Sequence, residues 1–405
     1  MLNNSTLMET NFTPSRKKYN LTDFLLGFCR IFIGLLFIFS GLIKANDPTG
    51  FGYKLQEYFL VFHTDFLYDY SVWIAIFICG FEIILGAFLL LGFFKNKVAW
   101  GLLLLSIFFL FLTFYSAFFE VVSSCGCFGD AIPLTPWQSF SKDVVLLLFV
   151  ILIFTYRSRI NPLVTTNAAR RLLTSLVVII AFGTGIYTLY FLPFIDFLPY
   201  KEGNNIPELM VMPEGKEGDV YQQVYEIKHK QTGEVKKVTD KEYMDGIWED
   251  DNWEVIGEPT SKLIKKGYEI PIPDLFISDM EGNDITQEII TNPYYNFIVV
   301  STSVEKLSLA DMIALDRINT TIRDLATDYN LRATLLTASS NEAALGLQDE
   351  MDLVLEILHA DAVPLKSMVR SNPGVLLLRN GTIIKKWSKI TFPTKKEIED
   401  TYLSK

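Results

Sequence analysis

Metal-binding and nucleotide-binding signals are scarce in this sequence. The 405 residues include 3 histidines and 4 cysteines. The histidines, His63, His229 and His359, are scattered along the chain, whereas a metal site needs clustered ligands, so we expect no histidine-based metal site. The chain also lacks a phosphate-binding glycine loop, a serine nucleophile elbow and an HExxH motif. Transport ATPase and hydrolase functions therefore have no support.

Positive charge is scarce as well. The formal net charge is -10, with 36 Lys and Arg against 46 Asp and Glu. No basic stripe is available to neutralise phosphates, which argues against a nucleic-acid partner. Apolar residues make up 50% of the chain and crowd into its first half, whereas the charges lie mostly in the second. This uneven distribution predicts a membrane part followed by a soluble part.

Five stretches approach the length of about 20 apolar residues that a helix needs to cross a membrane. They run over Phe24–Ile43, Val72–Phe94, Val98–Phe119, Val144–Tyr156 (short, with an extension back to Phe140) and Leu172–Leu192. The first stretch follows a polar tail and is longer than the apolar core of a signal peptide. We therefore interpret it as an uncleaved anchor.

Basic residues predict the orientation of these spans, because Lys and Arg stay on the cytoplasmic side during insertion. They cluster in the amino-terminal tail, between spans two and three and between spans four and five, as Arg16, Lys17, Lys18, Lys95, Lys97, Arg157, Arg159, Arg170 and Arg171. With five spans, these segments share one side. We expect a multi-pass protein of the bacterial inner membrane, surrounded by lipid, with a cytoplasmic amino terminus and a periplasmic carboxyl domain.

The membrane half carries a recognisable set of motifs. They are "RIFIGLLFIFSGLIKANDPTGFGYKLQEYF" from Arg30 to Phe59, "FEIILGAFLLLGFF" from Phe81 to Phe94, and "CGCFGD" from Cys125. This pattern resembles the DoxX/MauE family of small four-helix membrane proteins over about residues 21–156. The resemblance implies a function in electron transfer or, in the MauE branch, in maturation of a disulfide-rich periplasmic enzyme.

Two charges fall inside the predicted spans. By the helical rise, Arg30 lies roughly 10 Å inside the cytoplasmic edge and Glu82 lies close to the middle. A lone charge there costs at least about 3 kcal/mol, so we expect Arg30 and Glu82 to form an ion pair in the bundle interior. The pair either fixes how two helices pack or forms a proton or quinone-headgroup site. Lys44, at the outer boundary, is expected to reach water.

Cys125 and Cys127, one glycine apart in "SSCGCFGD", are the candidate catalytic residues. On the outer side disulfides can persist, and a disulfide closed over one residue is strained and therefore more oxidising. This favours thiol exchange, with a static structural pair and a two-thiolate metal site as alternatives. Cys79 is a candidate third, resolving thiol, although a buried cysteine is often just a small hydrophobe.

The soluble half begins with a hairpin pattern around a Thr-Gly turn and a short helix capped at Thr239 or Asp240. Alternating strand and helix signals follow, predicting a parallel-centred α/β sheet closed by a hairpin. This order resembles a thioredoxin fold, and in "NPGVLLLRNG" Pro373 stands at the family's cis-proline. No cysteine follows Cys127, so this domain cannot exchange disulfides by itself. Pro373 and Gly374 are a candidate peptide-binding edge, or the remnant of a scaffold.

The predicted fold class is a membrane α-helical bundle, a four-helix core plus a fifth helix, followed by a soluble thioredoxin-like α/β domain. The predicted domains are a cytoplasmic tail (1–20), a DoxX/MauE-like membrane domain (21–156), a loop and fifth transmembrane helix (157–194), a hairpin-and-helix spacer (195–267) and a thioredoxin-like domain without catalytic cysteines (268–405).

Three functions are compatible with these features. The first is thiol–disulfide exchange or maturation of envelope proteins at the Cys125–Cys127 pair, with a periplasmic protein client or a membrane redox partner. The second is a non-enzymatic envelope scaffold, and the third is an accessory subunit of a quinol-linked respiratory complex. Whether the chain is an enzyme stays open, and no cofactor other than a quinone is expected.

Overall fold

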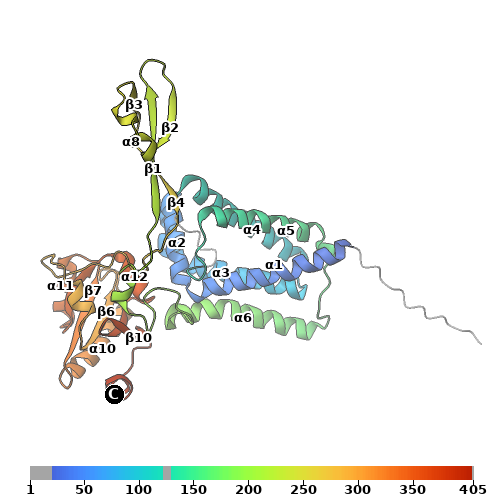
Figure 1. The fold of residues 1–405 in the computed structure, drawn as a ribbon. Coiled ribbons are helices and arrows are strands. Elements are labelled where there is room, and N and C mark those ends of the chain that lie inside the picture. Colours follow the sequence, from blue (N-terminus) through green and yellow to red (C-terminus); the bar gives the residue numbers. More distant parts are fainter. Residues whose placement is uncertain (1–20, 122–128, 404–405) are drawn as a thin grey trace, which may run out of the picture. The chain divides into compact units, whose positions relative to one another are not determined.

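The computed structural model describes residues 21–121 and 129–403. The chain divides into two compact units, one formed by the helices up to Leu189 and the other by the segment from Asp196 onward. The first unit is a helical bundle and the second is built around a β-sheet (Figure 1). Each unit is described by itself.

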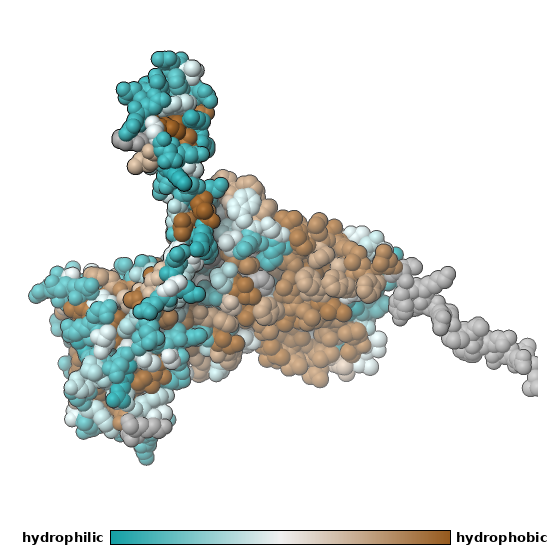
Figure 2. Space-filling model, in the orientation of Figure 1, coloured by the Kyte–Doolittle hydropathy of each residue, from teal (hydrophilic) through white to brown (hydrophobic). Residues whose placement is uncertain are grey.

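The bundle has five helices that are long and apolar enough to span a membrane, which makes the chain a multi-pass membrane protein. They are α1 (Leu21–Asn46), α3 (Ser71–Leu91), α4 (Lys95–Phe119), α5 (Pro136–Thr155) and α6 (Asn167–Phe191). The face in Figure 2 is hydrophobic over these helices, and side chains such as Phe24, Ile31 and Leu35 are exposed on α1. The five predicted spans are thus confirmed.

Two features of the bundle differ from the sequence-based expectation. Helix α5 begins at Pro136, well before the predicted Val144, because Thr135 and Gln138 form a capping box that starts it. A further helix, α2 (Pro48–Val61), was not predicted, and the Asp47 carboxylate caps it by accepting a hydrogen bond from the Gly50 N–H at 2.8 Å. Short 3-10 turns lie at Asp65–Tyr70 (η1) and Arg157–Arg159 (η2).

Glycine allows a close approach of helices α1 and α3. A Cβ atom added at Gly86 on α3 would lie 2.6 Å from the carbonyl oxygen of Gly34 on α1. Small residues of this kind let membrane helices approach closely, where lipid provides no hydrophobic driving force. The contact fixes the antiparallel register of α1 and α3.

The soluble unit contains a six-stranded sheet with the order β10-β9-β6-β7-β8-β5. Its strands are β5 (Ile277–Ser278), β6 (Tyr295–Ser301), β7 (Leu331–Thr337), β8 (Glu356–Ala360), β9 (Gly374–Arg379) and β10 (Thr382–Ser388). Strands β6, β7 and β8 are parallel, and β9, β10 and β5 are antiparallel to their neighbours. This parallel centre closed by a hairpin is the predicted thioredoxin-like arrangement.

Both faces of this sheet are covered. Along β6, Ile298 and Val300 pack into one hydrophobic cluster, whereas Phe297 and Val299 pack into another, because successive side chains point to opposite faces. The accompanying helices are α9 (Thr286–Ile290), α10 (Leu309–Ala326), α11 (Asn341–Met351), α12 (Ala362–Met368), α13 (Lys395–Ile398) and the final turn Glu399–Leu403. Covering both faces explains why the strands read as continuous apolar runs. The Asn372–Pro373 peptide bond is cis, as predicted.

A second, smaller sheet precedes the thioredoxin-like part. It consists of β1 (Val220–His229), β2 (Val235–Thr239), β3 (Trp253–Val255) and β4 (Thr260–Lys265), with α7 (Ile206–Leu209), α8 (Asp240–Met244) and η3 (Ile247–Glu249) alongside in the chain. The predicted hairpin is confirmed, and Thr239 caps α8. The predicted helix ends at Met244, however, and the residues after it form β3 and β4, both paired with β1.

Candidate functional site

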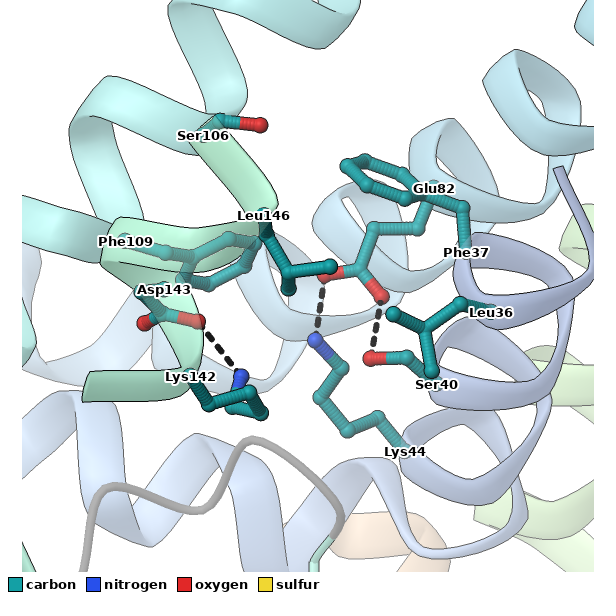
Figure 3. A pocket seen from close by; sticks show the side chains of 10 residues that line it. All are labelled: Leu36, Phe37, Ser40, Lys44, Glu82, Ser106, Phe109, Lys142, Asp143 and Leu146. Atoms are coloured by element: carbon teal, nitrogen blue, oxygen red, sulfur yellow. Dashed lines mark hydrogen bonds and ion pairs between the residues drawn. The ribbon is translucent and has the colours of Figure 1, made fainter. Parts of the chain in front are cut away.

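A buried ion pair occupies the interior of the bundle. Lys44 on α1 pairs with Glu82 on α3, and each residue is 2% exposed. The Ser40 hydroxyl donates a hydrogen bond to Glu82 Oε2 at 3.1 Å (Figure 3). Lys44 Nζ also lies over the rings of Phe51 and Phe109, 5.2 and 4.5 Å from their centroids. One carboxylate and two aromatic faces therefore stabilise this ammonium group in place of water.

The predicted ion pair between Arg30 and Glu82 is wrong. Arg30 Nε and Nη2 donate to the carbonyl oxygens of Leu89 and Leu90 at 2.9 and 2.7 Å, at the end of α3. The antiparallel register explains the difference, since it places Ser40, rather than Arg30, opposite Glu82. The expectation that Lys44 reaches water is wrong for the same reason, because its side chain turns inward to this carboxylate.

A second polar group comes from the start of α5. Asp143 is 4% exposed, and Lys142 Nζ lies 2.5 Å from its Oδ1. Thr113 on α4 donates a hydrogen bond to Asp143 Oδ2 at 3.1 Å. The sequence reasoning missed this group because it began the fourth span at Val144. The capping box at Thr135 is the signal that would have placed Asp143 inside the helix.

A small cavity separates the two ion pairs. Its volume is about 30 Å³, more than the roughly 10 to 15 Å³ that one water molecule needs on this measure. It is lined by Leu36, Phe37, Ser40, Lys44, Glu82, Ser106, Phe109, Lys142, Asp143 and Leu146 (Figure 3). The Ser106 hydroxyl on α4 has no hydrogen-bond partner among the residues that the structure describes, although the residue is only 6% exposed.

The cysteines fall into two classes. Cys29 and Cys79 are free thiols with no exposed surface, and Cys79 packs in an apolar cluster that includes Phe51 and Ala181. Cys125 and Cys127 lie outside the described residues. Their exchange chemistry, and the predicted role of Cys79 as a third thiol, stay predictions.

The soluble unit has a polar cluster after β6, where thioredoxins carry their cysteines. The Glu305 carboxylate accepts hydrogen bonds from the hydroxyls of Ser339 and Ser303 at 2.5 and 2.8 Å. The bond from Ser339 is the main cause that lowers the pKa of Glu305 below its usual value. Within residues 21–121 and 129–403, no three His, Cys, Asp or Glu side chains converge as a metal site.

The candidate peptide-binding edge lies at the start of β9. Gly374 is paired with Val300 on β6 and with Ser388 on β10, so its backbone lies inside the sheet. The carbonyl oxygen of Asn372 accepts a hydrogen bond from Lys389 Nζ at 3.3 Å. Peptide binding at Pro373 and Gly374 stays a prediction.

Three known proteins or families resemble this chain. Residues 22–156 match the family model described as Methylamine utilisation protein MauE. Protein TlpB of Flavobacterium psychrophilum is 29% identical over 137 residues, which cover 33% of this chain and 37% of TlpB, so the match spans little more than a third of that relative. The crystal structure of yeast Sco1 aligns with 33% of this chain and 94% of its own, at 14% identity and a TM-score of 0.28.

The family match and the sheet topology together describe the chain as a MauE-like membrane domain followed by a thioredoxin-like domain. The matched residues include both ion pairs that line the cavity, and they also include Cys125 and Cys127. The site in the bundle and the cysteine pair therefore belong to the same family-matched part of the chain.

Proposed function

We propose that this membrane protein takes part in thiol–disulfide exchange, with Cys125 and Cys127 as the exchanging residues. The observation that carries the proposal is the burial of the other thiols. Cys29 and Cys79 have no exposed surface, and the soluble unit contains no cysteine at all. This leaves Cys125 and Cys127 as the candidate thiols for exchange with a client protein.

In maturation, the two thiols of a client are oxidised to a disulfide while a Cys125–Cys127 disulfide is reduced to two thiols. The reaction passes through a mixed disulfide between one client sulfur and one sulfur of the pair. We propose a quinone in the membrane as the oxidant that restores the pair, taking up two electrons and two protons to become a quinol.

The proposed orientation places this chemistry in the periplasm of a bacterium. Lys95 and Lys97 begin α4, and Arg157 and Arg159 follow α5, which puts these basic residues at the same end of the bundle. The positive-inside rule assigns that end to the cytoplasm. The connection between α4 and α5 and the carboxyl-terminal unit then both lie on the periplasmic side, where disulfides persist.

In this proposal the thioredoxin-like unit binds the client. It has a thioredoxin-like sheet order, and a sheet edge can bind an extended peptide through backbone hydrogen bonds. Because it has no thiol of its own, it contributes position rather than chemistry. The MauE match and the similarity to TlpB support the same general assignment.

Single-cysteine variants test the proposal. Cys125→Ser and Cys127→Ser proteins would be expressed in bacterial membranes, quenched with acid and separated on non-reducing gels. In the reverse of the exchange step the Cys125 thiolate attacks a client disulfide, one client thiol leaves, and Cys127 resolves the mixed disulfide. We therefore expect Cys127→Ser to accumulate a high-mass band that reductant removes. The matched control is Cys79→Ser, which removes a buried thiol and should give no such band.

Other results of this experiment would support one of the two alternative functions. If neither variant forms a reductant-sensitive band and growth is unchanged, exchange chemistry is wrong and a non-enzymatic envelope scaffold becomes the better description. Co-purification with a quinol-linked oxidase, together with silent cysteine variants, would instead identify an accessory subunit of a respiratory complex.

A further inference from the structure

The polar residues that line the cavity lie at different depths below the end of the bundle where α4 and α5 are connected. Asp143 is about 10 Å along α5 from its start at Pro136, and Ser106 is about 20 Å along α4 from its end at Phe119. The end of α4 and the start of α5 are joined by a single connection, so both depths are measured from the same face. The hydrocarbon core is about 30 Å thick, so the polar residues extend from near this face past the middle of the bundle.

The cavity between these residues is suited to water. Its volume of about 30 Å³ leaves room for water, since one water molecule needs about 10 to 15 Å³ on this measure. Its lining offers a carboxylate from Glu82, a carboxylate from Asp143 and the hydroxyl of Ser106. Ser106 Oγ is buried with no partner among the described residues, and an unmet hydrogen bond of this kind is costly in a low-dielectric interior. A water molecule satisfies it.

The other half of the bundle is sealed by apolar side chains. Ile33, Leu89, Phe93, Leu102 and Ile153 are all less than 3% exposed and form one continuous cluster. Arg30 also lies in this half, but its guanidinium is bound by carbonyl oxygens at the end of α3. Water that enters from the α4–α5 side therefore meets this apolar cluster before it can reach the opposite face.

We infer that the cavity is a hydrated, one-sided proton site, in which water held by Ser106 carries protons between the α4–α5 face of the membrane and Glu82. In the transfer, the Glu82 carboxylate takes one proton from water and becomes a neutral acid, and the proton is replaced from solution on that face. Lys44 keeps its own proton and remains a cation. The inference does not depend on the proposed thiol exchange.

The charged surroundings of Glu82 come from several helices. Lys44 approaches from α1, while Lys142 and Asp143 line the same cavity from α5. On α3 itself Cys79 lies one turn before Glu82, buried and free. The contributions to the cavity from α4, Ser106 and Phe109, are uncharged. Proton uptake by Glu82 is therefore set by two cations and one carboxylate around one small cavity.

The sidedness can be measured on the unaltered full-length protein. Vesicles would be selected in which the carboxyl-terminal unit faces outward, and the pH would be changed either outside or inside. Infrared difference spectroscopy follows the carbonyl stretch of the protonated carboxyl, and Glu82→Gln identifies the band. We expect the band to follow the outer pH within seconds and to ignore the inner pH. A response to the inner pH, or to neither pH over hours, would overturn the inference.

Two variants that remove buried hydroxyls test the water itself. Ser106→Ala removes the hydroxyl in the cavity, and we expect the response to slow about tenfold, which corresponds to about 1.4 kcal/mol in the barrier. Thr174→Val on α6 is the control, because the Thr174 hydroxyl also has no hydrogen-bond partner among the described residues but does not line the cavity. Thermal melting in detergent checks that both variants are folded. Equal rates for the two variants and the wild type would overturn the role of Ser106.

Discussion

The membrane bundle and the soluble unit each bury a lysine–carboxylate pair, but the two pairs have different surroundings. The side chains of Lys44 and Glu82 are 1% and 2% exposed, and aromatic rings flank the ammonium group. Lys386 and Asp196 lie 2.6 Å apart with side chains that are 6% and 24% exposed. The soluble pair thus keeps one partner in contact with water. The comparison teaches that the membrane pair depends mainly on protein groups for its solvation, and the cavity beside it leaves room for water.

Thiol exchange requires cysteines and a surface that binds the client, and the two units each contain one of these. All 4 cysteines belong to the membrane part of the sequence, whereas the fold that commonly presents peptides to a thiol belongs to the soluble unit. If both parts act together, the loss of cysteines from the thioredoxin-like unit is compensated by a pair on another domain. The loss of stability caused by a substitution in one unit can therefore be compared with the loss caused by a substitution in the other.

The largest effect is expected for Lys44→Ala in the bundle. The change leaves the buried Glu82 carboxylate without its ammonium partner, and removing one partner of a buried pair costs about 3 to 5 kcal/mol. Thermal unfolding in detergent measures this loss. The double variant Lys44→Met with Glu82→Gln is the control and should recover most of it, since no charge remains unpaired. Equal stability of Lys44→Ala and wild type would show that Glu82 does not need Lys44.

A smaller loss is expected for Asp196→Ala in the soluble unit. The side chain of Asp196 is partly exposed, so water can replace part of its interaction and we expect a loss of about 2 kcal/mol. Burial lowers the pKa of Lys386. The loss should therefore shrink as the pH rises toward that lowered pKa, because a neutral amine no longer needs the carboxylate. Denaturant unfolding between neutral and alkaline pH measures this. A loss that grows with pH would contradict the assignment.

The next effect concerns helix packing. Gly86→Ala places a methyl group 2.6 Å from the carbonyl oxygen of Gly34, which forces α1 and α3 apart at a cost of about 1 to 2 kcal/mol. Gly183→Ala on α6 is the matched control, since a Cβ there has nothing within 4 Å. Both changes gain the same helix propensity, so the difference in melting between them reports the packing. Identical melting would mean that the helices separate without cost.

Much of this architecture could be predicted from the sequence. The apolar runs predicted the five long helices, and the alternation of strand and helix signals predicted the sheet order that ends in the β9–β10 hairpin. Helix α2 was missed because its 14 residues contain Gly50 and Gly52 and have no long apolar run. Strands β3 and β4 were missed because β4 is exposed along its whole length and has no buried face to mark it.

The site was harder to predict than the fold. Glu82 was recognised as an intramembrane charge, but its partner depends on the register of α1 against α3, and close packing at Gly34 and Gly86 sets that register. The pattern of residues within each helix does not show how far one helix is shifted along the other. Asp143 was missed for a local reason, the position of the helix start, and the cavity depends on four helices at once.

The smallest effect is expected at Glu305, where the soluble unit holds a carboxylate in place of the thioredoxin cysteines. The hydrogen bond from Ser339 lowers the pKa of Glu305 in the folded state, below an unfolded value of about 4.3. A lowered carboxylate pKa stabilises the fold fully above the unfolded value, and the gain is lost as the pH falls through the folded pKa. Ser339→Ala should remove part of this gain, by less than about 1 kcal/mol because Glu305 is exposed.

The measurement is a comparison of unfolding at neutral and acidic pH. Ser339 also accepts a hydrogen bond from the Val304 N–H at 2.9 Å, so Ser339→Ala carries a loss that does not depend on pH as well. The control is the same substitution in a Glu305→Gln background, where only that constant loss should remain. A pH-dependent difference that persists without the carboxylate would show that Glu305 is not its source. In contrast to Glu82, Glu305 faces water directly, and its titration should follow the pH of the compartment around the soluble unit.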